Sequence, residues 1–323
     1  MERAVLSIQI IKNITNGFTD IIGEGSFGVV YKGKYNGKQV AVKKLRESSQ
    51  LSETDFEKEV QILKLVDHQN IVKLIGYCCQ REDPTEQRPS FGSRDVVEKF
   101  LCFEYVPNGS LDKCIYGEPS KLGWDKRFKI IKGICKGLDA LHGQGRRIIH
   151  SDLNPANILL DDNMEPKIAD FGLSRIFGEN QTHTRITNSK SAMEYMAPEY
   201  LQRGQLSIES DIYSLGLLII EITTGEKNCS DDELYTTDFT EDVRKNWTNM
   251  PYIKLKYPAL SSDGYRQVEG CIKIGLNCLS KKRKDRPNSA NIVHKVDQIG
   301  AGSSSVFHRA DMPFEISASP FWA

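Results

Sequence analysis

Residues 150–160 read HSDLNPANILL, with an acidic side chain and an amide five positions apart in a polar stretch that leads into apolar residues. Asp152 is expected to accept a proton from a substrate hydroxyl, and Asn157 is expected to offer its amide oxygen to a metal ion. The apolar residues 158–160 favour a buried strand directly after the loop. This stretch is therefore the candidate catalytic loop.

A second pattern, GEGSFG at residues 23–28, matches G-x-G-x-x-G and is a weak signal by itself. A dinucleotide-binding fold needs a helix to begin at these glycines, whereas a kinase uses them in a hairpin over nucleotide phosphates. Here β-branched residues flank Asn36-Gly37, which favours a hairpin and disfavours a helix. Glycines also let backbone N–H groups approach phosphates. From this pattern alone, a glycine-rich hairpin without a ligand stays open.

Lys43 ends the apolar run VAV at residues 40–42, where a buried ammonium needs an anion. The kinase pattern supplies two anions, namely the nucleotide phosphates and a glutamate on the next helix. That helix is predicted from residue 53 to 66, because an apolar stripe recurs at helical spacing. The stripe consists of Phe56, Val60 and Leu63. Glu59 lies beside it and is the expected partner of Lys43; a solvated surface helix is the alternative.

Further signals follow in the order typical of a kinase. Asp170 opens a DFG tripeptide and is expected to bind magnesium, because this hard cation prefers carboxylate oxygen. Glu199 closes an APE tripeptide and is the expected buried partner of Arg286. Each tripeptide alone is a chance event, but the ordered set is specific and predicts a nucleotide-binding phosphotransferase.

The order of motifs predicts an α+β, two-lobed protein kinase fold. We expect a small lobe with a five-stranded antiparallel sheet and one helix, followed by a larger, mainly helical lobe. The nucleotide is expected in the crevice between the lobes. The predicted parts are an N-terminal extension at 1–16, the small lobe at 17–105, the large lobe at 106–298 and a disordered tail at 299–323.

Bulk composition limits the partners. The 43 Lys and Arg residues balance the 43 Asp and Glu residues, so no nucleic-acid partner is expected. The eight cysteines lack metal-ligand spacing and predict buried thiols in a reducing compartment. Neither a signal peptide nor a transmembrane segment is recognisable. We expect a cytoplasmic monomer or transient dimer that reaches the plasma membrane through partners.

The chain resembles plant receptor-like protein kinase domains, most closely the cysteine-rich receptor-like and receptor-like cytoplasmic kinases. The resemblance spans about residues 17–298. It rests on the phrases IGYC at 75–78, YVPNGSL at 105–111 and SDIYSLG at 210–216. It implies ATP with Mg²⁺, or Mn²⁺ as an alternative, a Ser/Thr hydroxyl as acceptor, and a protein substrate or receptor complex as partner.

The same resemblance implies how the nucleotide is held. Phe103 would stand beside the adenine as gatekeeper, and the backbone of Glu104 and Val106 would bond to it. The regulatory spine would stack Leu63, Leu74, His150 and Phe171. The residues expected to contact the nucleotide are Ile22, Gly23, Glu24, Gly25, Ser26, Gly28, Val30, Ala41, Lys43, Phe103, Glu104, Val106 and Leu159.

Three positions depart from the family pattern. Ser151 replaces the arginine that receives a phosphorylated activation-loop residue, which argues against this form of switching. Asn154 replaces the lysine that contacts the γ-phosphate, and Ala192 replaces the threonine that bonds both that lysine and the catalytic Asp. Loss of one preorganised donor can cost about 10²–10³ in rate. The activation loop, at about 173–196, still carries hydroxyls at Ser174, Thr182, Thr184, Thr187, Ser189 and Ser191.

Two hypotheses of different classes therefore stay open. The first is a slow, magnesium- and ATP-dependent protein kinase that uses Asp152 as its base. The second is a nucleotide-binding pseudokinase that serves as a signalling interaction module, which Asn154 and Ala192 favour. A nicotinamide-dependent oxidoreductase is a distant third, because no helix is expected after the glycines.

Overall fold

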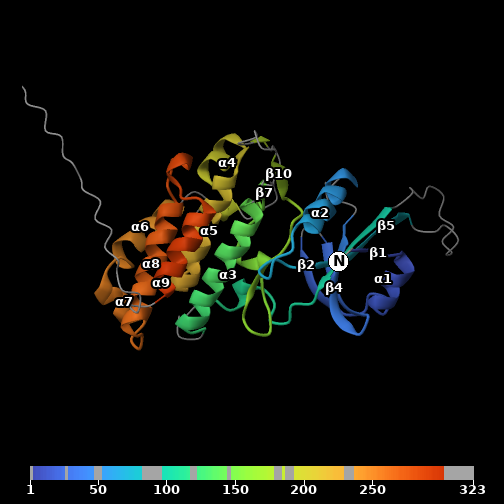
Figure 1. Cartoon of the computed structure of the whole chain (residues 1–323), viewed down its shortest axis with the longest axis horizontal. Coiled ribbons are helices and arrows are strands. Elements are labelled where there is room, and N and C mark those ends of the chain that lie inside the picture. The colour runs from blue at the N-terminus through green and yellow to red at the C-terminus, as the bar shows by residue number, and fades with distance from the viewer. Residues whose placement is uncertain are drawn as a thin grey trace, which may run out of the picture.

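A β-sheet lobe and a mainly helical lobe make up the computed structural model of the chain (Figure 1). This arrangement confirms the predicted α+β, two-lobed fold. The residues that the structure describes are 3–25, 28–46, 53–81, 97–116, 122–143, 147–177, 184–185, 193–228 and 236–301.

The small lobe is built on a six-stranded sheet with the order β1-β5-β6-β4-β3-β2. Its strands are β1 Ala4–Val5, β2 Ile21–Gly25, β3 Gly28–Tyr35, β4 Lys38–Leu45, β5 Leu74–Arg81 and β6 Val97–Glu104. Five of them pair antiparallel as expected, but β1 adds a sixth that runs parallel to β5. The predicted five-stranded sheet was therefore one strand short, because a two-residue strand leaves no periodicity in the sequence.

The residues before the expected domain boundary pack onto this lobe. Helix α1 (Ile8–Ile14) follows β1 and lies beside the sheet (Figure 1). Its side chains Ile11 and Ile14, together with Leu6, are buried in an apolar cluster with strand residues of β4, β5 and β6. The Arg3 guanidinium donates to the carbonyls of Lys64 and Val66, at 2.6 and 2.8 Å. The segment is thus a packed part of the lobe.

The hairpin predicted from Asn36-Gly37 is present between β3 and β4. Both turn residues have positive φ, +48° and +80°, which is the backbone conformation that Asn-Gly favours in a two-residue hairpin turn. The glycines of the motif lie on two paired strands, Gly23 and Gly25 on β2 and Gly28 on β3. A strand rather than a helix therefore follows the glycines, which rules out the dinucleotide-binding arrangement.

The small-lobe helix α2 (Glu53–Leu65) matches its predicted range closely. The large-lobe helices are α3 Trp124–His142, α4 Pro198–Arg203, α5 Ile208–Thr224, α6 Thr236–Asn246, α7 Met250–Lys256, α8 Ser262–Cys278 and α9 Ser289–Gly300. Its short strands are β7 Arg147–Ile149, β8 Ile158–Leu160, β9 Pro166–Ile168, β10 Arg175–Phe177, β11 Thr184–Arg185 and β12 Gln205–Leu206, paired as β7–β10, β8–β9 and β11–β12. The 3-10 helices are η1 Leu111–Lys113, η3 Pro155–Asn157, η4 Met193–Tyr195 and η5 Arg283–Asp285.

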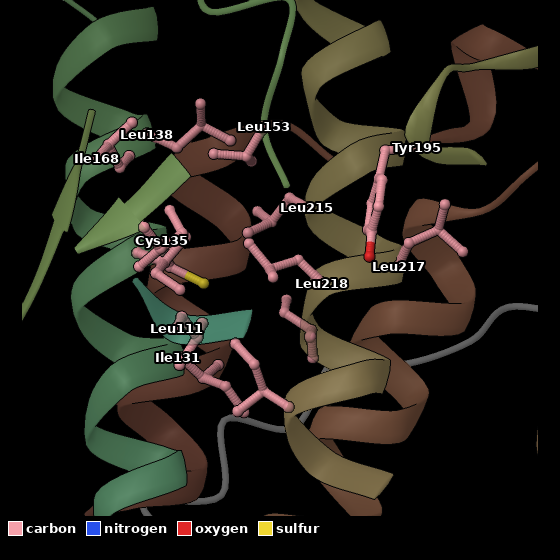
Figure 2. Close-up of a cluster of buried hydrophobic side chains, with 14 of the residues drawn as sticks. Leu111, Ile131, Cys135, Leu138, Leu153, Ile168, Tyr195, Leu215, Leu217 and Leu218 are labelled. Atoms are coloured by element: carbon pink, nitrogen blue, oxygen red, sulfur yellow. The ribbon is translucent and has the colours of Figure 1, made fainter. Parts of the chain in front are cut away.

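Helix α5 forms the centre of the large lobe. Nearly its whole length is buried, as expected of a helix that is apolar on all sides. Figure 2 shows its side chains Leu215 and Leu218 facing Cys135 and Leu138 of α3. Because α5 begins at Ile208, Asp211 lies in its first turn and is buried at the end that faces the catalytic loop. The lobe's core thus supports the candidate catalytic loop directly.

Five of the eight cysteines are buried thiols, namely Cys78, Cys102, Cys135, Cys271 and Cys278. Burial raises the pKa of the Cys78 thiol to about 11 and that of Cys102 to about 12, so both stay protonated and unreactive. Cys229 lies outside the described residues. Within the described ranges, no helix combines the length and the apolar character needed to cross a bilayer.

Candidate active site

The candidate catalytic loop lies between β7 and β8, and the buried Asp211 carboxylate holds its backbone. Asp211 Oδ2 accepts from the His150 N–H at 2.7 Å, and Oδ1 accepts from the Ser151 N–H at 2.9 Å. Ser151 has φ +69°, a left-handed conformation that non-glycine residues rarely adopt. Two hydrogen bonds to the buried Asp211 carboxylate offset this strain and fix the backbone of the loop.

Both carboxylate oxygens of Asp152 accept hydrogen bonds from side-chain amides. Asn157 Nδ2 donates to Oδ2 at 2.9 Å, and Asn154 Nδ2 donates to Oδ1 at 3.1 Å. The same two nitrogens donate to the Asp152 carbonyl, at 2.8 and 3.0 Å. Asn154 Oδ1 also accepts from the Ala156 N–H at 3.0 Å and caps η3. No prediction from the sequence placed Asn154 in contact with the Asp152 carboxylate.

His150 is fully buried behind this loop. Its Nδ1 accepts from the Asp152 N–H at 3.3 Å, which leaves the proton on Nε2, 3.0 Å from the Ala169 carbonyl oxygen. Burial lowers the pKa of His150, so the ring is neutral. The ring packs edge to face against Phe171, with the ring centroids 5.0 Å apart. Leu63 and Leu74 are buried in the same apolar core as Phe171. The four residues expected to form the spine are therefore all buried where the lobes meet.

Lys43 lies close to two acidic side chains. Its Nζ is 2.8 Å from Asp170 Oδ1, and only 11% of the side chain is exposed. Burial lowers the pKa of Lys43, but the nearby charges of Asp170 and Glu59 outweigh it, so the pKa is raised overall. Burial raises the pKa of Asp170, but Lys43 outweighs that effect and lowers it. The Lys43–Asp170 pair is therefore ionised on both sides.

Glu59, the expected partner of Lys43, is 2% exposed and projects from α2 toward the DFG tripeptide. A Cβ placed on Gly172 would lie 3.5 Å from Asp170 Oδ1 and 3.6 Å from Glu59 Oε2, so both carboxylates converge there. Burial raises the pKa of Glu59 to about 7; Lys43 opposes this rise and Asp170 adds to it. Among the described residues, none forms a hydrogen bond with Glu59 Oε1. The Lys43–Glu59 pair stays a prediction, because the ion pair with Asp170 competes for the ammonium.

The two predicted metal ligands fit a magnesium ion that is shared with a nucleotide. Asn157 uses its amide nitrogen on Asp152, so its oxygen is the atom that can bind a cation. Asp170 uses Oδ1 on Lys43, and its second oxygen adds a hard donor. Across the described ranges, no cluster of three or more His, Cys, Asp or Glu side chains could hold a metal. This small donor set suits Mg²⁺, which typically takes its remaining ligands from phosphates and water.

The predicted nucleotide-contacting residues that the structure describes lie on β2, β3, β4, β6 and β8 and in the segment after β6. In the sheet, Val30 is opposite Lys43, and Ala41 is opposite Phe103. The Glu104 N–H donates to the Lys73 carbonyl at 3.0 Å, so Glu104 can offer the adenine only its carbonyl. The remaining positions are Ile22, Gly23, Glu24 and Gly25 on β2, Gly28 on β3, Val106 after β6 and Leu159 on β8, whereas Ser26 lies outside the described residues.

Gly28 is required by close packing beside β4. A Cβ at this position would lie 2.1 Å from the carbonyl oxygen of Lys44, which no rotamer change could relieve. Only glycine lets β3 approach β4 this closely at the start of the hairpin. The third glycine of the motif thus has a packing role that the motif alone does not reveal.

The activation-loop hydroxyl at Ser174 is part of the core. Ser174 is 1% exposed, and its Oγ donates to the His150 carbonyl at 3.1 Å. In this conformation it is neither solvated nor open to phosphorylation. Thr184 lies on β11. Thr182, Thr187, Ser189, Ser191 and Ala192 lie outside the described residues.

The expected pair between Glu199 and Arg286 is confirmed. Arg286 Nη1 and Nη2 donate to Glu199 Oε1 and Oε2 at 2.6 and 2.8 Å, in a bidentate geometry. The arginine side chain is fully buried and also donates to the carbonyls of Glu209 and Ser280. This pair joins α4 to the segment before α9 and fixes the end of the activation segment.

The comparison with known proteins agrees with this geometry. The family model of the protein kinase domain matches residues 18–296. Cysteine-rich receptor-like protein kinase 8 of Arabidopsis thaliana is 40% identical over 299 residues, which cover 89% of this chain and 41% of that protein. Cysteine-rich receptor-like protein kinase 6 of Oryza sativa subsp. japonica is 38% identical over 300 residues, which cover 90% of this chain and 41% of that protein.

The likeness extends to a second receptor-like group. A G-type lectin S-receptor-like serine/threonine-protein kinase of Arabidopsis thaliana is 38% identical over 300 residues, which cover 90% of this chain and 34% of that protein. The chain thus spans less than half the length of these relatives. Because the family model covers most of the chain, the chain belongs to the protein kinase family, and it is related at about 40% identity to plant cysteine-rich receptor-like kinases.

Proposed function

We propose that this chain is a slow, Mg²⁺- and ATP-dependent protein kinase that transfers the γ-phosphate to Ser or Thr hydroxyls of a protein in intracellular signalling. Membership of the family implies ATP, a divalent metal and protein substrates in general. The observation that best supports catalysis is the placement of Asp152, whose carboxylate is held by two amides on a loop that Asp211 anchors. A general base must be held in such a fixed orientation to meet a hydroxyl.

Each residue has a distinct role in this proposal. Asp152 accepts the hydroxyl proton as the acceptor attacks, and Lys43 contacts the nucleotide phosphates. Glu59 would be the buried partner of Lys43 when Asp170 holds the metal. Asn157 and Asp170 would hold Mg²⁺, which, when bound, neutralises charge on the phosphates. The glycine hairpin at 23–28 covers the phosphates and excludes water.

The setting in the cell is also part of the proposal. A protein substrate or a receptor complex is the expected partner, and the chain acts as a monomer or transient dimer. It works in the cytoplasm and reaches the plasma membrane through that partner. Ser151 leaves the loop without the arginine that receives an activation-loop phosphate, so activity does not depend on that form of switching.

A second candidate is a nucleotide-binding pseudokinase that acts as an interaction module. The observation that favours it is Asn154, a neutral amide beside Asp152 where the family pattern has an ammonium. Nucleotide binding needs only Lys43, Asp170 and the hairpin, whereas turnover also needs charge stabilisation at the γ-phosphate. The two candidates therefore differ in turnover and agree on binding.

One experiment separates the candidates. The purified chain is incubated with γ-labelled ATP, Mg²⁺ and casein as a generic acceptor, beside the variant Asp152→Asn. The kinase hypothesis predicts incorporation by the wild type above the variant, with label on phosphoserine or phosphothreonine. Equal incorporation in both rejects the enzyme hypothesis. If neither is labelled while ATP still raises the melting temperature in a Mg²⁺-dependent manner, the pseudokinase hypothesis is supported.

A further inference from the structure

We propose that Asn154 is a positioning residue that holds the Asp152 carboxylate in the orientation needed to accept a proton. The inference rests on the proposed kinase function and assigns a new role to this position. The family pattern has a lysine here, whose work is to contact the γ-phosphate. Asn154 is too short and uncharged for that work, but its contacts point to a different one.

The Asn154 amide is locked at both ends. Its nitrogen donates to the Asp152 carbonyl at 3.0 Å and to Asp152 Oδ1 at 3.1 Å, and its oxygen accepts from the Ala156 N–H at 3.0 Å. Rotating the amide by half a turn would place its oxygen against two acceptors and its nitrogen against a donor. With 7% of the residue exposed, water cannot take over these bonds. The geometry therefore selects one orientation of the amide.

Asn154 and Asn157 act on opposite oxygens of the same carboxylate. Asn157 donates to Oδ2 at 2.9 Å and Asn154 to Oδ1 at 3.1 Å, from the two ends of η3. Two donors, one on each oxygen, fix the rotation of the carboxylate about the Cβ–Cγ bond of Asp152. A single donor does not fix it. Each carboxylate oxygen has a second lone pair, so the amides leave capacity for a substrate hydroxyl.

The replacement of lysine by asparagine thus divides two functions. A neutral amide keeps the orienting contact to Asp152. The positive charge that a lysine would place at the γ-phosphate is missing, so Lys43 and the metal would have to supply it. A misplacement of a reacting group by about 1 Å can lower the rate about 10²-fold. Removal of the Asn154 amide should therefore slow an already slow site further, with little effect on nucleotide affinity.

The main alternative is that Asn154 only caps η3. Two substitutions separate this role from positioning. Asn154→Asp keeps a good capping acceptor but replaces the donor with a second carboxylate beside Asp152. Asn154→Ser is a neutral counterpart that also caps well, but its hydroxyl is too short to reach Oδ1. A matched control is Asn288→Asp, because Asn288 caps α9 through the Asn291 N–H at 2.8 Å, away from the site.

The kinetic test measures kcat, KM for ATP and melting temperature for the wild type and these variants. Positioning predicts that Asn154→Asp and Asn154→Ser each lower kcat about 10²-fold. KM for ATP should stay unchanged in Asn154→Ser, both Asn154 variants should remain folded at the assay temperature, and Asn288→Asp should keep full kcat. Wild-type kcat in Asn154→Ser, or a loss of kcat accompanied by an equal loss of nucleotide affinity, would overturn the proposal.

A second readout does not need activity, so it separates failure of this inference from failure of the proposed function. In the full chain labelled with ¹⁵N-asparagine, the side-chain N–H₂ protons of Asn154 should be protected from exchange. In Asp152→Ala, the side-chain N–H proton of Asn154 and of Asn157 that donates to the carboxylate should lose its protection, whereas the proton that donates to the backbone carbonyl at position 152 should keep it. Asn70, which is buried and donates to the Pro166 carbonyl at 3.0 Å, should be unaffected. Two unprotected Asn154 protons in the wild type, or two protected ones in Asp152→Ala, would contradict the proposed contact whether or not the chain transfers phosphate.

Discussion

Single residues in this chain carry out their roles through partners that are buried with them. Asp152, Lys43 and Glu199 each meet oppositely charged or amide groups that burial shields from water. In such a setting, removing one partner leaves the other desolvated and uncompensated, so the effect exceeds that of a surface pair. The Arg286–Glu199 pair offers the clearest measurement, because it lies away from the proposed chemistry.

We predict that Arg286→Met destabilises the fold by about 3–5 kcal/mol, the usual range for breaking a buried ion pair. Glu199 would lose both of its bidentate bonds, and the carbonyls of Glu209 and Ser280 would lose their donor. Urea unfolding measures the free energy. The surface pair Lys273–Glu269 provides the control, since Lys273→Met should cost less than about 1 kcal/mol. Equal costs would show that burial does not strengthen the dependence on Arg286.

At the scale of elements, α5 joins the activation segment to the core through Glu221. The Tyr195 hydroxyl of η4 donates to Glu221 Oε2 at 2.6 Å, and the Asn228 N–H donates to Oε1 at 2.6 Å. Figure 2 shows the Tyr195 side chain reaching into the buried cluster around α5. Glu221 is fully buried, and burial raises its pKa to about 7 despite these two bonds. The attachment of η4 to α5 is therefore sensitive to pH near neutrality.

The sign of this dependence follows from the raised pKa. The folded state favours protonated Glu221, so its stabilising effect is complete below the ordinary value of 4.5 and is lost as pH rises through about 7. At about 1.4 kcal/mol per pKa unit, the loss amounts to about 3 kcal/mol. Glu221→Gln, which cannot ionise, should show a flatter decline in unfolding free energy between the ordinary pKa of 4.5 and the raised pKa of about 7. Glu226→Gln on the surface serves as the control; identical pH slopes in all three proteins would reject the assignment.

The N-terminal segment is the second element-scale feature, and Gly76 gives access to it. A Cβ at Gly76 would lie 2.8 Å from the Ala4 carbonyl oxygen and 2.9 Å from Leu6 Cδ1. We predict that Gly76→Ala displaces β1 and speeds hydrogen exchange of residues 3–14, with loss of about 2–5 kcal/mol if Ile11 leaves its buried site. Gly25→Ala should not change exchange in this segment, because, apart from its chain neighbours, no described atom lies within 4 Å of a Cβ there. Unchanged exchange in Gly76→Ala would indicate that the strand docks independently of β5.

At the scale of the whole molecule, one continuous apolar core crosses from the small lobe to the large one. It includes Leu63 of α2, Leu74 of β5 and Phe171 after β9. The charged contact Lys43–Asp170 crosses between the lobes beside this core. A nucleotide that touches both lobes should therefore stabilise the entire chain as a unit.

We predict that ATP with Mg²⁺ raises the unfolding free energy by about 2.7 kcal/mol when ligand exceeds its Kd 100-fold. Differential scanning fluorimetry measures the corresponding rise in melting temperature. Asp170→Asn should lose the Mg²⁺-dependent part of the rise, because it removes the carboxylate proposed to hold the ion. A rise in the variant that still depends on Mg²⁺ as in the wild type would place the metal elsewhere.

Much of the fold and site was predictable because its signals are contiguous in the chain. The hairpin follows from the turn chemistry of Asn36-Gly37, and α2 follows from apolar residues at helical spacing. Asp152 and Asn157 lie on one short loop, so their proximity is set by a few backbone angles. In each case, interactions within a few residues are sufficient to define the local structure.

Other features depend on segments that are distant in sequence, and no local pattern encodes them. Strand β1 exists only because the edge of β5 is available to pair with it. Ser174 is buried against the catalytic-loop segment, where its hydroxyl donates to the His150 carbonyl. Lys43 Nζ lies 2.8 Å from Asp170 Oδ1, which is 127 residues away in the sequence, so this contact forms only when the two lobes pack together.

The amino-acid sequence by itself predicts a kinase fold and the residues of the candidate site, because strands, turns and helices arise from neighbouring residues. The pairing of charges and the position of Asn154 against Asp152 arise only when packing removes water and leaves each buried polar group to find a partner.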